Sequence, residues 1–124
     1  MVAELPAGSA RLILSADDSD WCQVSLDLGE LYPLGAESCP ILVEKLLKSL
    51  RVEVSGPESG TIDGVEVTWV LSLSERHTTI YTAQRDDLRA LYFQGADGSL
   101  IARLDLSEEQ RLEWVSLLEA IKRT

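Results

Sequence analysis

The sequence is poor in the side chains that most often carry out chemistry. Its 124 residues include one histidine, one methionine, one phenylalanine and two cysteines. Any histidine general base or Ser-His-Asp arrangement would have to use His77, and no G-x-S-x-G motif accompanies it. We interpret His77 as an exposed turn residue without a catalytic role. The composition therefore favours a protein that binds over one that catalyses.

Cys22 and Cys39 are too few for a disulfide framework and lack the C-x-x-C or Cys/His spacing of a zinc site. Cys22 falls in an alternating strand pattern, where a thiol behaves as a small apolar side chain. Free structural thiols are the main interpretation, with a disulfide or a reactive thiol as the alternative. Glycine-rich phosphate-binding motifs are also absent. We predict no catalytic residue, no metal site and no cofactor.

Long apolar runs are absent as well. No stretch approaches the roughly 20 residues needed to cross a membrane, and residues 1–10 hold neither a basic side chain nor an apolar run of signal-peptide length. We therefore expect a cytoplasmic protein without membrane association. The length fits a single domain over residues 1–124, with residues 1–10 as a loose N-terminal segment.

Acidic side chains, in contrast, are abundant and concentrated. The first 44 residues carry eight acidic side chains and a single basic one, Arg11, which gives −7 of the chain's formal charge of −10. Such a surface repels nucleic acid and anionic lipid, and it attracts a basic protein surface or a cation. The predicted partner is another protein with a basic surface, and nucleic acid is excluded.

Hydrophobic periodicity predicts an α+β fold. Strand patterns cover residues 11–15, 21–28, 65–74, 78–84, 88–94 and 100–106, with a further short strand possible at residues 52–54. Residues 29–39 and 55–64, rich in glycine and proline, are expected to be loops. Helical patterns cover residues 40–50 and 107–122, the second opening with a Ser107–Gln110 capping box. We predict a mostly antiparallel sheet of six or seven strands, with both helices packed on it.

The acidic run at residues 17–20 is predicted to form the tip of a hairpin between the first two strands. It lacks the spacing of a calcium-binding loop, so we interpret it as a solvated turn or a contact for a partner. Trp69 and Trp114 lie on predicted core faces, whereas Trp21 is a candidate for exposure and for a binding hot spot. The candidate partner-binding residues are Asp17, Asp18, Asp20, Trp21, Asp27, Glu30 and Glu37.

Two partial resemblances bear on these hypotheses. A strand followed by residues 107–115 (SEEQRLEWV) resembles the end of pleckstrin-homology domains. Those domains bind phosphoinositides through basic pockets, and the acidic first third and the helix at Pro40 depart from their pattern. Size, acidity and helix-on-sheet composition are similar to type III secretion chaperones, although those usually open with a helix.

Three functional hypotheses follow from these observations. The first is a non-catalytic inhibitor or immunity-type protein, a monomer or homodimer, whose acidic N-terminal third masks a basic surface of another protein. The alternative is a dimeric secretion chaperone or assembly adaptor that holds a client segment in an apolar groove. The second alternative is a small enzyme that uses carboxylates alone or a bound cofactor.

Overall fold

A computed structural model describes residues 2–17, 19–51 and 60–123, with nine strands and two helices among them. The order along the chain is β1 (Val2–Ala7), β2 (Ala10–Ala16), β3 (Trp21–Asp27), β4 (Leu31–Ser38), α1 (Cys39–Arg51), β5 (Gly60–Ile62), β6 (Val65–Ser72), β7 (Thr79–Arg85), β8 (Leu88–Gln94), β9 (Leu100–Leu106) and α2 (Glu108–Lys122). The short strand considered at residues 52–54 lies outside the described residues.

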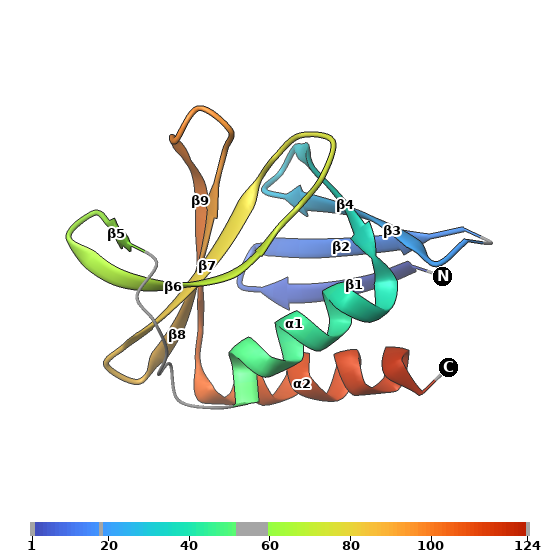
Figure 1. Cartoon of the computed structure of the whole chain (residues 1–124). Coiled ribbons are helices and arrows are strands. Elements are labelled where there is room, and N and C mark those ends of the chain that lie inside the picture. Colours follow the sequence, from blue (N-terminus) through green and yellow to red (C-terminus); the bar gives the residue numbers. More distant parts are fainter. Residues whose placement is uncertain (1, 18, 52–59, 124) are drawn as a thin grey trace.

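The strands form two antiparallel sheets, so the prediction of one sheet of six or seven strands was wrong. The first sheet has the order β1-β2-β3-β4 and the second has the order β5-β6-β7-β8-β9. A four-stranded meander followed by a helix thus occurs twice, with β5 added ahead of the second meander. Figure 1 shows the two sheets splayed apart, with α1 and α2 side by side along one side of them. The α+β class and both helices were predicted.

Three strands lie where loops or a loose segment were expected. β1 pairs with β2 along its whole length, so the N-terminal segment is not loose. β4 and β5 were interpreted as loops because glycine and proline interrupt them. Proline and glycine are compatible with edge strands and bulges, and β4 is such a strand: its register with β3 shifts between Val24 and Ser25.

Both helices contribute to one core that also contains the inner faces of the two sheets. α1 buries Val43, whereas Ile41 is 46% exposed although it is one of the apolar residues at helical spacing in this segment. α2 buries Trp114 and Leu118 and packs against α1, β1, β8 and β9. A smaller cluster of apolar residues covers the other face of the second sheet: Ile62, Val67, Ala83, Ala90 and Tyr92.

Candidate functional site

The acidic residues of the N-terminal third separate into two groups at opposite ends of β3. Asp17 and Asp20 lie in the turn before this strand, whereas Asp27 is its last residue and Glu30 lies in the turn that follows. A strand of seven residues spans roughly 20 Å. These side chains therefore do not form one continuous acidic face.

The acidic group at the end of β3, which contains Asp27 and Glu30, is partly neutralised. Arg11 on β2 lies opposite Asp27 and forms ion pairs with it and with Glu4, the latter at 2.8 Å. The hydrogen bond from Arg11 keeps the pKa of Asp27 below its usual value. Arg11 thus offsets the charge of Asp27, and a basic partner has less to gain at this end.

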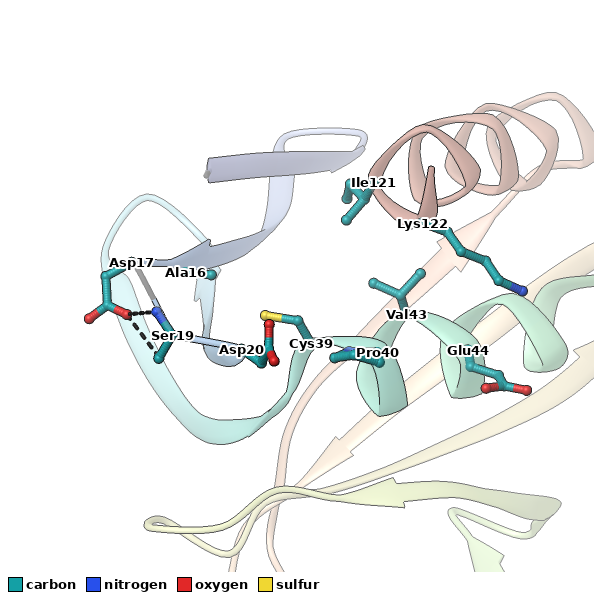
Figure 2. A pocket seen from close by; sticks show the side chains of 10 residues that line it. All are labelled: Ala16, Asp17, Ser19, Asp20, Cys39, Pro40, Val43, Glu44, Ile121 and Lys122. Atoms are coloured by element: carbon teal, nitrogen blue, oxygen red, sulfur yellow. Dashed lines mark hydrogen bonds between the residues drawn. The ribbon is translucent and has the colours of Figure 1, made fainter. Parts of the chain in front are cut away.

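The acidic group before β3, which contains Asp17 and Asp20, lines an open pocket of about 320 Å³. Figure 2 shows the side chains that line it, which come from the β2–β3 turn, the start of α1 and the end of α2. Three carboxylates and one ammonium group are among the lining side chains, and Cys39, Pro40, Val43 and Ile121 supply apolar wall. The charged lining residues are Asp17, Asp20, Glu44 and Lys122.

Asp17 is held in place by its own turn. Its carboxylate accepts hydrogen bonds from the backbone N–H and the hydroxyl of Ser19, each at 2.9 Å (Figure 2). The Ser19 hydroxyl oxygen in turn accepts a hydrogen bond from the N–H of Trp21. The two bonds from Ser19 lower the pKa of Asp17, so this carboxylate stays charged under mildly acidic conditions as well as at neutral pH.

The three tryptophans differ in exposure, and the prediction was right for two of them. Trp21 begins β3 next to Asp20 and is 41% exposed. Trp114 is fully buried and donates its indole N–H to the Pro6 carbonyl. Trp69 was expected in the core but is 44% exposed, with the Lys45 ammonium 4.9 Å from its ring centre. Trp21 thus supplies exposed aromatic surface at the start of β3, outside the lining of the pocket.

Two predicted partner-binding residues, Glu37 and Asp18, remain to be placed, and several residues of the pocket were not predicted. Glu37 lies opposite Cys22 in the register, at the same end of β3 as the pocket, and its carboxylate accepts the N–H of Ser38. Asp18 lies outside the described residues. The sequence interpretation missed Glu44, although it is one of the eight acidic residues of the N-terminal third. Ile121 and Lys122 come from the other end of the chain, and no local pattern could link them to this turn.

Comparison with known proteins identifies no family and no relative of this chain. No protein-family model, curated protein or solved structure matches the chain. Neither described helix is long and apolar enough to cross a membrane. Within residues 2–17, 19–51 and 60–123, no group of three or more His, Cys, Asp or Glu side chains is placed to hold a metal ion.

The chemistry available at the pocket is recognition of a cation with an apolar stem. Carboxylates at the rim attract positive charge, while the proline, valine and isoleucine side chains offer contact to methylene groups. The side chains of lysine and arginine combine these two properties. The arrangement therefore suits a basic side chain.

Proposed function

We propose that this protein is a non-catalytic binding module that recognises a basic surface of another protein, and that the pocket beside the β2–β3 turn is its contact site. The observation that supports the proposal best is the meeting of Asp17, Asp20 and Glu44 around one open pocket. Trp21 follows Asp20 in the chain and is exposed, although it does not line the pocket. Carboxylates placed in this way speed encounter with a basic partner and favour it over other proteins.

The chaperone alternative has less support. In the described part of the chain, the sides of α1 and α2 that face the sheets are filled by buried side chains such as Leu46, Leu47, Trp114 and Leu118. A client segment would have to displace this core in order to bind between a helix and a sheet. The proposal therefore places the partner outside the core, at the end of the molecule.

The test compares three immobilised forms of the protein in a lysate of its native host. The site variant carries Asp17→Asn, Asp20→Asn and Glu44→Gln, which remove three charges with little change in side-chain size. The control variant carries Asp87→Asn, Glu66→Gln and Glu113→Gln, which remove three exposed charges elsewhere. Both variants have the same net charge, so a difference between them reports on position and not on total charge.

We expect wild type and control to retain the same basic protein at low salt and the site variant to lose it. With the retained protein purified, stopped-flow mixing should show association that slows as salt rises, and that is slower for the site variant at every low-salt condition. Equal retention by all three forms, or retention of acidic proteins alone, would contradict the proposal. Circular dichroism of each variant checks that the fold is intact.

A further inference from the structure

The two cysteines of the chain lie close together at the end of the β3–β4 pairing, next to the pocket. Cys22 is on β3, faces the core and is 1% exposed. Cys39 is the first residue of α1, is half-buried and lines the pocket. One thiol is therefore enclosed by protein, and the other borders the solvent.

The backbone brings them to the same side of the first sheet. Cys22 lies opposite Glu37 in the β3–β4 register, and the N–H of Cys39 donates to the Asp20 carbonyl at 2.6 Å. Strand pairing thus continues to the first residue of the helix. Cys39 is two residues beyond the partner of Cys22, so the two are diagonal neighbours. Both side chains pack in or against the same core cluster, and the interaction with Cys39 is one of the causes that raise the pKa of Cys22.

An oxidant arriving from solvent meets Cys39 first. In Figure 2 the sulfur of Cys39 points away from α1, towards the β2–β3 turn. The Cys22 thiol is shielded on the core side and also lies 3.8 Å from the Gln23 carbonyl oxygen. The order of reaction is therefore set by access, with Cys39 attacked first and Cys22 second.

We propose that Cys39 is a thiol-modification site and that Cys22 is its resolving partner, so that a small disulfide converts the pair into an internal disulfide. The Cys39 thiolate attacks one sulfur of a disulfide R–S–S–R, forming Cys39–S–S–R and releasing R–S⁻, which takes up a proton. The Cys22 thiolate then attacks the Cys39 sulfur, forming the Cys22–Cys39 bond and releasing a second R–S⁻, which is also protonated. Both cysteines are oxidised and R–S–S–R is reduced to two thiols.

The surroundings of the pair determine which disulfides react and how fast. Three carboxylates, those of Asp17, Asp20 and Glu44, line the approach to Cys39 against one ammonium group, that of Lys122. The approach is therefore net negative, and a cationic disulfide should react faster than an anionic one. Burial, followed by the contact with Cys39, raises the pKa of Cys22 to about 12. Since the thiolate is the attacking form, the second step should be slower than the first and should accelerate as the pH rises from 7.

The experiment treats the reduced, folded protein with cystamine, a cationic disulfide, and follows the intact mass after acid quenching. We expect transient addition of one cysteamine, then loss of two hydrogen atoms relative to the reduced protein. Trypsin cannot separate the cysteines, because no Lys or Arg lies between them, so a protease that cuts after glutamate at Glu30 and Glu37 is used for the map. The expected product is a pair of peptides joined through Cys22 and Cys39.

The variants assign the two roles. Cys22→Ser should stop at the cysteamine adduct on Cys39, and Cys39→Ser should remain unmodified while folded. Two results in the wild-type protein would overturn the proposal without recourse to the variants: a cysteamine adduct that persists on Cys39 up to pH 9, or no reaction under conditions where the urea-unfolded chain reacts fully.

A comparison of two disulfides tests the effect of charge separately. The ratio of the initial rates with cystamine and with oxidised glutathione should fall several-fold in the Asp17→Asn, Asp20→Asn, Glu44→Gln variant. An unchanged ratio would show that the carboxylates do not control access. The disulfide proposal rests on the diagonal placement of the two cysteines and on their difference in exposure. It therefore holds or fails independently of the protein partner proposed above.

Discussion

At the scale of single residues, Tyr92 on β8 is a buried side chain whose hydroxyl group forms no hydrogen bond with the described residues. It is 1% exposed, and its hydroxyl oxygen has no hydrogen-bond partner within residues 2–17, 19–51 and 60–123. It belongs to the smaller apolar cluster, whose residues come from β5, β6, β7 and β8. A buried hydroxyl without a partner loses its hydration and gains no hydrogen bond in return.

Removing this hydroxyl should therefore stabilise the protein. We expect Tyr92→Phe to raise the free energy of unfolding by about 1 kcal/mol, measured by urea denaturation. Tyr81→Phe is the matched control, because Tyr81 is half-buried and lies directly opposite Tyr92 on β7. Its change should stay within about 0.5 kcal/mol. A loss of stability in Tyr92→Phe would mean that the hydroxyl makes a bond in solution.

At the scale of elements, the two helices differ in how their ends are held. α2 begins with a complete capping box: Ser107 accepts from the N–H of Gln110, and the Gln110 side chain accepts from the N–H of Ser107. The end of α1 is held by donors from distant elements. Arg89 on β8 donates to the Ser49 carbonyl, and Arg111 on α2 donates to the Leu50 carbonyl. These arginines satisfy carbonyl groups that a helix end leaves unpaired.

The start of α2 should therefore depend on one local side chain. We expect Ser107→Ala to lower the free energy of unfolding by about 1 kcal/mol, because the first turn loses its side-chain acceptor. Ser116→Ala, at an exposed position in the same helix, is the control and should be neutral or slightly stabilising. Similar losses in both variants would indicate that the cap contributes nothing. Thermal and urea unfolding both serve as readouts.

This difference explains which elements could be predicted from the sequence. The capping box, the alternation in β3 and the meander from β6 to β9 are local patterns, and they were predicted. β4 was missed because Pro33 and Gly35 are typical of loops, whereas here they occupy a bulged strand. The arginine donors at the end of α1 and the walls of the pocket, to which Glu44 and Lys122 both contribute, come from residues far apart in sequence. No single window of the sequence contains them.

At the scale of the whole molecule, the two meanders meet through a narrow backbone junction. Ala36 on β4 and Ser74, just after β6, exchange backbone hydrogen bonds at 3.2 Å and 2.9 Å, and the Ser74 hydroxyl also donates to the Ala36 carbonyl. The first sheet ends at β4, so this bridge joins it to the second sheet. The sequence could not reveal the division into two sheets, because it depends on how closely two distant backbones approach.

Gly35 makes that approach possible. Its φ is +135°, and a Cβ at this position would lie 2.3 Å from the Ser74 carbonyl oxygen and 2.9 Å from Leu73 Cβ. Neither atom is the end of a flexible side chain, so the two sheets would have to separate to accommodate even a methyl group. Positive φ adds a conformational cost for any residue with a Cβ.

We therefore expect Gly35→Ala to destabilise the protein by about 2 to 4 kcal/mol, as the sum of steric overlap and backbone strain. Gly29→Ala separates the two contributions, because Gly29 also has a positive φ, +102°, but an added Cβ there has no neighbour within 4 Å. It should cost about 1 kcal/mol. Urea denaturation measures both values. Equal losses would show that backbone conformation alone matters and that the sheets tolerate separation at Ser74. A larger loss in Gly35→Ala would identify this contact as the point that fixes the two halves against each other.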